Sequence, residues 1–207
     1  MIIHFVRHCE TKWNIDGKYS GHLDSPISKI GKSQTKQLAK YFRLMTDVDI
    51  ISSDLGRAKF TAEAISRMNG ATVMLEPRLR EIDFGILSGL TEEQIIEINP
   101  TIWKSYKMDP YNTQFPKGES GAQALTRAID LISELSLNTF RKNKILVTHG
   151  SILRLILGSV LGINNSDFRN KFLPVENGSI TTCVFNEKLH KNFVFNSGKL
   201  LTYNKCI

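Results

Sequence analysis

Two histidines and two arginines each follow a short apolar run of the kind that forms a buried strand. They are Arg7, His8, Arg57 and His149. In open α/β sheets ligands bind outside the carboxyl ends of the strands, so we expect these four side chains to meet in one cleft. A guanidinium offers a planar set of donors that matches phosphate, and an imidazole can act as a nucleophile. The four residues therefore predict a phosphate site.

His149 is followed by Gly150 and by an apolar segment that predicts a helix. We expect the free N–H groups at the start of this helix, and its dipole, to point toward the same cleft and to favour an anion. A glycine at this place also lets the backbone approach a ligand closely.

The chemistry that this set would support is phosphoryl transfer. That reaction needs fixed donors around the equatorial oxygens, an in-line nucleophile and a proton for the leaving oxygen. Arg7 and Arg57 would hold the oxygens, and the residues alone leave open whether His8 or His149 attacks. A protonated carboxylic acid would supply the proton, and Glu81 is the candidate because it lies in a loop rich in arginine and glycine.

Strands that alternate with helices must position these groups, which predicts a layered α/β fold with a largely parallel sheet. The expected strands are 2–6, 48–51, 71–75, 144–148, 180–185 and 193–195. Four longer helices are expected. The first begins after the N-cap Ser28, and its buried side carries Ile30, Leu38, Tyr41, Phe42 and Met45; the second begins after a cap at Ser53 or Asp54 and ends near residue 69. The third begins at Ser120, and the fourth begins after His149 and ends at Leu161. Short helices interrupted at Asn99-Pro100 are expected over 91–107, and loops over 76–89 and 109–118.

Composition favours one cytoplasmic domain. With 207 residues and 41% hydrophobic content, the chain can bury one sizeable core, so we expect a single domain over 1–207. No apolar run approaches the ~18 residues of a membrane span. The N-terminus lacks the features of a signal peptide, and an odd number of cysteines at unrelated spacings (Cys9, Cys183 and Cys206) suggests free thiols in a reducing cytosol.

The net charge of +7 fits small anionic ligands. The basic residues are scattered and form no block or aromatic-interleaved patch, so we expect a small phosphorylated metabolite as partner and no nucleic acid or membrane. Either a monomer or a homodimer is compatible with the sequence.

Taken together and in order, these segments resemble the histidine phosphatase (phosphoglycerate mutase-like) superfamily. The matching segments are Arg7-His8-x-x-Thr11, the glycine- and proline-containing stretch 21–31, the stretch 52–58 around Arg57, the stretch 79–85 around Glu81, the turn 118–120, and His149-Gly150. The matches run from residue 2 to about residue 155 in the family's order.

The resemblance implies a three-layer α/β/α sandwich and assigns the attack to His8, which would become phosphorylated, with Glu81 as proton donor. It implies no metal or organic cofactor. The phosphate pocket that it implies comprises Arg7, Asn14, Arg57 and His149, and the neighbouring substrate-binding positions are Ser20, Gly21 and Gly150. A plain turn residue at Asn14 and an ordinary loop carboxylate at Glu81 are the structural alternatives.

Within this family the chain looks closest to the shorter phosphatase branch. The cofactor-dependent mutases typically carry Ser and Glu where Thr11 and Lys12 stand, Tyr where Phe84 stands, and paired arginines in a longer insert that 108–113 lacks. We therefore expect hydrolysis of small phosphomonoesters. The alternatives are mutase-type phosphotransfer and a catalytically weak phosphate-binding protein.

Two positions depart from the family's pattern. Cys9 stands where a glycine usually follows the nucleophile, so its side chain must point away or narrow the pocket. Ser20 stands where some relatives have a longer polar residue. Both departures bear on substrate preference, and neither removes a catalytic group.

Overall fold

The computed structural model describes residues 1–137, 142–163, 174–185 and 198–205. Its centre is a six-stranded sheet with the strand order β3-β2-β4-β1-β5-β6. The strands are β1 (Ile2–Arg7), β2 (Val48–Ser52), β3 (Val73–Leu75), β4 (Asn143–Thr148), β5 (Ile180–Phe185) and β6 (Gly198–Lys205). β1 to β4 run parallel to one another, β5 pairs antiparallel with β1, and β6 pairs antiparallel with β5.

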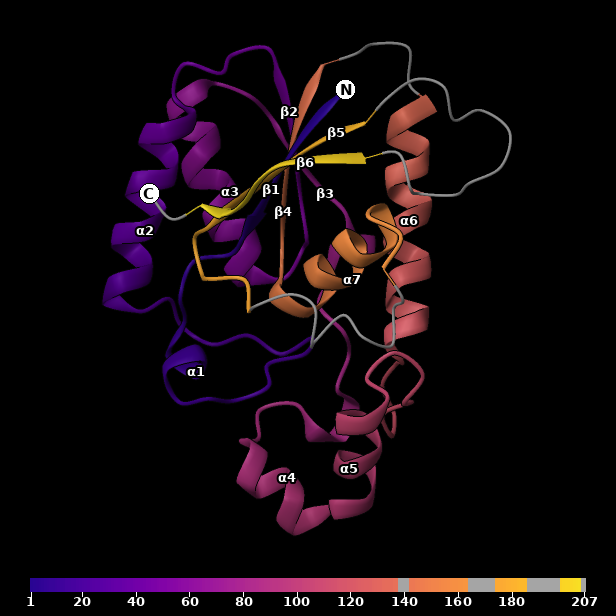
Figure 1. Cartoon of the computed structure of the whole chain (residues 1–207). Helices are drawn as coiled ribbons and strands as arrows, with labels where there is room; N and C mark the ends of the chain where they lie inside the picture. Colours follow the sequence, from indigo (N-terminus) through magenta and orange to yellow (C-terminus); the bar gives the residue numbers. More distant parts are fainter. Residues whose placement is uncertain (138–141, 164–173, 186–197, 206–207) are drawn as a thin grey trace.

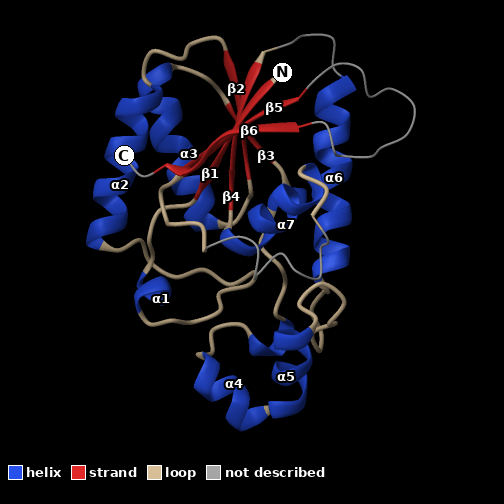
Figure 2. Ribbon diagram, in the orientation of Figure 1, coloured by secondary structure: helices blue, strands red, loops and turns tan. Residues whose placement is uncertain are grey.

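Helices cover both faces of this sheet (Figures 1 and 2). α2 (Lys29–Phe42) and α3 (Gly56–Asn69) bury Leu38 and Ile65 against Val6 and Ile145. α6 (Gly121–Leu137) and α7 (Gly150–Val160) pack in the other core with Ile3, Phe5 and Leu146. Alternate residues of each central strand thus face opposite helix layers, and the expected three-layer α/β/α sandwich is confirmed.

A small helical unit lies beyond the edge of the sheet, at the bottom of Figure 1. It consists of α4 (Glu92–Ile98) and α5 (Pro100–Met108), followed by the loop 109–118. The predicted interruption is confirmed: the Asn99 side chain accepts a hydrogen bond from the Ile102 N–H and caps α5, whose first residue is Pro100.

The predicted N-cap of α2 is confirmed, but fewer residues of this helix are buried than predicted. Ser28 accepts from the Gly31 N–H at 2.9 Å, as expected. Ile30 and Tyr41, however, are 58% and 43% exposed, while Leu38 and Phe42 are fully buried. α2 packs against α3 and the sheet through a narrow apolar stripe, so residues beside this stripe stay exposed to solvent.

The predicted cap of α3 is wrong. The N-cap residue is Leu55, which has no side-chain hydrogen bond to the helix. Ser53 and Asp54 bind His149 and Arg80 instead. The cap comes from a distant loop, where the Asp24 carboxylate accepts from the first N–H groups of α3. A cap supplied from another segment leaves no local sequence signal.

Several smaller differences concern the edges of the sheet and the loops. β3 begins at Val73 rather than at residue 71, and the loop 76–89 contains two 3₁₀ turns. The one-turn helix α1 (Lys12–Ile15) was not predicted. The predicted strand 193–195 lies outside the described residues, and the last described strand is β6. No helix in the described ranges combines the length and apolarity that a bilayer crossing requires.

Candidate active site

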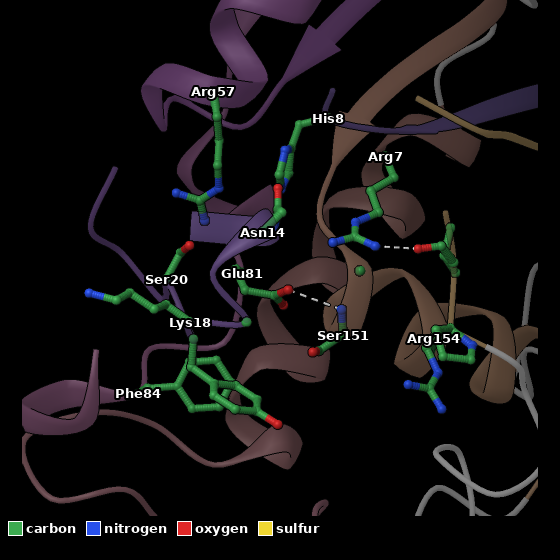
Figure 3. A pocket seen from close by; sticks show the side chains of 15 residues that line it. Arg7, His8, Asn14, Lys18, Ser20, Arg57, Glu81, Phe84, Ser151 and Arg154 are labelled. Carbon is green, nitrogen blue, oxygen red and sulfur yellow. Dashed lines mark hydrogen bonds between the residues drawn. The ribbon is translucent and has the colours of Figure 1, made fainter. Parts of the chain in front are cut away.

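The candidate site lies at the carboxyl ends of three neighbouring parallel strands, β1, β4 and β2. β1 pairs with β4 so that Arg7 lies beside Thr148, and β2 pairs with β4 so that Ser52 lies beside Val147. The residues that follow these strand ends therefore meet at one edge of the sheet, around a cavity of about 310 Å³ (Figure 3).

Most of the predicted site residues line this cavity. Gly21 and His149 lie directly behind it: the Gly21 carbonyl accepts from Arg57, and the His149 ring centroid is 5.1 Å from that of His8. The predicted residues in the lining are Arg7, His8, Asn14, Ser20, Arg57, Glu81 and Gly150.

The ring of His8 is held so that one of its nitrogen atoms is free to act as a nucleophile. Its Nδ1 lies 2.8 Å from the Cys9 carbonyl oxygen. Because a carbonyl only accepts, Nδ1 carries the proton and Nε2 keeps its lone pair. Burial lowers the pKa of His8 well below its ordinary value, and the positive charges of Arg57 and Arg7 lower it further. The imidazole is therefore neutral, which a nucleophile requires.

His149 stands behind His8 and is fully buried. Its Nε2 lies 2.8 Å from the Ser53 hydroxyl, and its Nδ1 has no hydrogen-bond partner among the described residues. Burial, followed by the charge of Arg57, holds the pKa of His149 well below its ordinary value.

Arg7 is partly buried at the end of β1. Its Nη1 donates to the Val175 carbonyl, and its Nε finds no partner in the described part of the chain. Burial lowers the pKa of Arg7, while the charges of Glu81 and Glu176 raise it. A Cβ on Gly150 would lie only 3.3 Å from the guanidinium carbon, so glycine gives Arg7 its room.

Arg57 lies in the first turn of α3 and is fixed by three acceptors. Its Nη1 donates to the Leu23 carbonyl at 2.7 Å and to Asp24 at 2.9 Å, and its Nη2 donates to the Gly21 carbonyl at 2.7 Å. Its Nε is buried without a partner within the described ranges. Unpartnered buried donors are costly, and a tetrahedral anion in the cavity that Arg7 and Arg57 line would give a partner to the free Nε donor of each.

Asn14 presents its amide nitrogen to the cavity because its oxygen is occupied. The Asn14 Oδ1 accepts from the Thr11 N–H at 3.0 Å, from the Thr11 hydroxyl at 3.1 Å and from Asn177 Nδ2 at 3.2 Å. Asn177 also donates to the His8 carbonyl at 3.0 Å. Asn177 escaped the sequence prediction, since an Asn-Gly pair indicates only a turn.

Glu81 lines the same cavity and occupies the N-terminus of α7. Its Oε2 accepts from the Ser151 N–H at 3.0 Å, the contact drawn in Figure 3, and its Oε1 accepts from Ile152 and Ile82 at 3.0 Å. The expectation that free N–H groups of this helix face a ligand is therefore wrong for Ser151 and Ile152. The carboxyl group of Glu81 takes the place of a ligand at the positive end of the helix dipole.

Comparison with known proteins agrees with this geometry. A family model described as the histidine phosphatase superfamily (branch 1) matches residues 3–196. The chain belongs to the histidine phosphatase superfamily. It is 34% identical over 164 residues to Phosphoserine phosphatase 1 of Hydrogenobacter thermophilus, covering 79% of this chain and 77% of that protein. It is 33% identical over 164 residues to the Probable phosphoglycerate mutase GpmB of Proteus mirabilis, covering 78% of this chain and 75% of that protein.

Solved structures of superfamily members share the fold. A mycobacterial glucosyl-3-phosphoglycerate phosphatase, solved with VO3, is 25% identical, with a TM-score of 0.85 over 98% of both chains. A putative alpha-ribazole-5'-P phosphatase from Escherichia coli has a TM-score of 0.87 at 23% identity, over 99% of this chain and 96% of that one.

In this superfamily member, an outer wall that the sequence prediction missed surrounds the cavity mouth. Phe84 lies on one side, and Ser151 and Arg154 lie on the other (Figure 3). The Tyr19 ring, which also lines the cavity, meets the Phe84 ring edge to face with the centroids 5.2 Å apart. Arg154 follows Gly150 by four residues on α7, a spacing that shares a helix face, so this signal was available. Lys18 and Tyr19 lie in an irregular loop, where no sequence pattern indicates that they line the cavity.

Cys9, which replaces the usual glycine of this superfamily, does not line the cavity. It is fully buried in the core beneath α2 and α3, and its N–H donates to Thr61. Burial raises the pKa of its thiol. Of the two possibilities that the sequence raised, the side chain points away from the pocket. Among the described residues no cluster of His, Cys, Asp and Glu is arranged to hold a metal ion.

Proposed function

We propose that this superfamily member is a phosphatase that hydrolyses small phosphomonoesters through a phosphohistidine on His8, with Glu81 as proton donor. One observation carries the proposal: a buried, neutral imidazole whose Nδ1 proton is hydrogen-bonded to a carbonyl, next to guanidinium donors of Arg7 and Arg57 that have no partner among the described residues. That environment fits an electron-poor phosphorus bearing anionic oxygens.

In the first step, the Nε2 lone pair of His8 forms a bond to phosphorus as the bond from phosphorus to the leaving oxygen breaks. Arg7, Arg57 and the Asn14 amide hold the three remaining oxygens. Glu81, in its protonated form, gives its proton to the leaving alkoxide, so the product departs as an alcohol. The Nδ1 proton of His8 stays on the ring and is donated to the Cys9 carbonyl oxygen, and this hydrogen bond stabilises the positive charge of the phosphorylated ring.

In the second step, water attacks the phosphorus of phosphohistidine. Glu81, now a carboxylate, accepts a proton from this water while the bond from phosphorus to Nε2 breaks. Inorganic phosphate leaves, and both His8 and Glu81 return to their starting protonation states. One carboxyl thus serves as acid and then as base.

The choice of water as acceptor rests on the absence of the mutase features in the sequence and on relatives named as phosphatases. A specific observation favours the second candidate, phosphoglycerate mutase-type transfer, because other relatives of similar identity are named probable phosphoglycerate mutases. A cytoplasmic location and a small phosphorylated metabolite as partner stay predictions.

The two candidates separate in one assay. A panel of phosphomonoesters, phosphoserine and phosphoglycerate included, is incubated with the protein, and released phosphate is measured together with any isomeric phosphoester. We expect release of inorganic phosphate matched to substrate loss, and none with H8A. Isomer formation that exceeds phosphate release would establish the mutase, and unreduced turnover by H8A would exclude His8 as the nucleophile.

A further inference from the structure

The segment that carries Glu81 is held in place mainly by side chains. It runs between two 3₁₀ turns, Pro77–Leu79 and Gly85–Leu87, and so lies outside the regular hydrogen bonding of the sheet and the longer helices. Several of its carbonyl groups nevertheless accept hydrogen bonds from side chains. The Thr148 hydroxyl donates to the Leu79 carbonyl at 2.8 Å, and the His22 Nε2 donates to the Glu81 carbonyl at 3.0 Å.

The remaining donors come from one guanidinium, that of Arg127 on α6. Its Nη1 donates to the carbonyls of Arg78 and Arg80, both at 2.8 Å, and its Nη2 donates to the Glu81 carbonyl at 2.9 Å. The other two N–H groups bind the Glu119 carboxylate. All five donors of the guanidinium are therefore in use, which no other side chain can reproduce.

Glu119 extends this arrangement to the other side of Glu81. Its Oε1 accepts from the Asp83 N–H at 3.0 Å, and its own N–H donates to the Asp83 carbonyl at 3.0 Å. The Arg127 and Glu119 side chains are 21% and 18% exposed, so solvent only partly screens their contact. The two residues together hydrogen-bond the backbone on both sides of Glu81.

We propose that Arg127 is a positioning residue that holds the Glu81 carboxyl where it can protonate the leaving oxygen. The proposal rests on the proton-donor role of Glu81 given above. Arg127 is absent from the lining of the cavity, so it acts through the backbone of Glu81 and does not touch the substrate. Small displacements of a catalytic group cost much of its effect, because proton transfer depends on distance.

The test compares two substrates of different leaving-group strength, 2,4-dinitrophenyl phosphate and glycerol phosphate. A dinitrophenolate needs little protonation, whereas an alkoxide depends on the acid. We expect E81Q to lose roughly 100-fold or more in kcat/KM, which reports the phosphorylation step, on glycerol phosphate and less than about 10-fold on the aryl ester. R127K should lose at least about 10-fold on the alkyl ester and less than about 3-fold on the aryl ester, with inhibition by inorganic phosphate unchanged.

Lysine keeps the positive charge and a contact with Glu119 but has only three donors, so R127K separates position from charge. The matched control is R78M, because the Arg78 side chain binds the surface carboxylates of Glu76 and Glu134 and does not reach Glu81. We expect R78M to change the ratio of the two rates by less than about 2-fold. Should R127K fail to fold, E119Q weakens the same arrangement and should shift the ratio in the same direction.

A double-mutant cycle decides whether the effect passes through Glu81. In the E81Q background R127K should cause little further loss on glycerol phosphate, since residues that act as a unit are not additive. Equal losses by R127K on both esters, or the same loss with and without E81Q, would overturn the proposal. If E81Q itself shows no preference between the esters, both the donor role and this proposal fail. Phosphorylation of His8 is measured separately and would stand.

Discussion

The pH dependence of stability tests whether His8 and His149 are neutral in the native protein. Both imidazoles are buried, and burial together with the arginine charges lowers their pKa well below the value of 6.5 for an exposed histidine. When the pH falls through that value, the unfolded chain takes up protons that the native state refuses. The stability that the neutral rings contribute is therefore complete above about pH 7.5 and is lost below 6.5.

The size of the effect follows from proton linkage. Each such histidine should remove about 1.4 kcal/mol of unfolding free energy for each pH unit below the unfolded pKa, so the two together remove about 2.8 kcal/mol for each unit. His4, whose pKa burial also lowers, adds to the wild-type slope. Carboxylates contribute mainly at lower pH, which leaves the interval from about pH 6.5 to 5.5 to the histidines.

The assay is urea unfolding of the wild-type protein and H8N at about pH 7.5, 6.5 and 5.5, in buffers free of phosphate. Asparagine is the matched replacement because its amide nitrogen can keep the donation to the Cys9 carbonyl, while the side chain cannot titrate. We expect the stability of H8N relative to wild type to rise by about 1.4 kcal/mol between about pH 7.5 and 5.5. A difference that stays constant over this interval would refute the neutral, buried imidazole.

Two further predictions concern residues that hold the phosphate pocket from behind. D24A should lower the unfolding free energy by about 1 to 3 kcal/mol, since it removes both the cap of α3 and a charged hydrogen bond to Arg57, and it should weaken inhibition by inorganic phosphate. An unchanged urea midpoint would show that the helix needs no such cap. N177A should weaken phosphate inhibition by about 10-fold because the Asn14 amide loses one of its three fixed contacts. An inhibition constant equal to that of wild type would mean that Thr11 suffices.

The central layers of the fold could be predicted because their signals are local. A buried parallel strand gives a continuous apolar run, and Ser28 and Asn99 give recognisable caps. The apolar periodicity failed where it depended on tertiary cover, as at Ile30 and Tyr41. The cap of α3 failed because Asp24 is distant in sequence, and no local pattern records that contact.

The candidate site divides in the same way. Arg7, His8 and His149 could be placed because Arg7 ends β1 and the two histidines follow β1 and β4 directly, so the sheet fixes their positions. Arg127 and Asn177 gave no comparable signal, since they act through backbone carbonyls and a side-chain amide of distant segments. Residues that touch a ligand can be found by their chemistry, but residues that orient them become visible only in three dimensions.

The central claim, that His8 carries the phosphoryl group, is tested most directly by trapping the intermediate. E81Q should react with 2,4-dinitrophenyl phosphate, which needs no acid, and then hydrolyse slowly, because the base for the water is missing. The protein is denatured at neutral or alkaline pH and digested, and the modified peptide is located by mass spectrometry. We predict one phosphoryl group on His8 and no labelling of E81Q carrying H8A as well. A label on His149, or rapid turnover with no covalent intermediate at all, would contradict the mechanism.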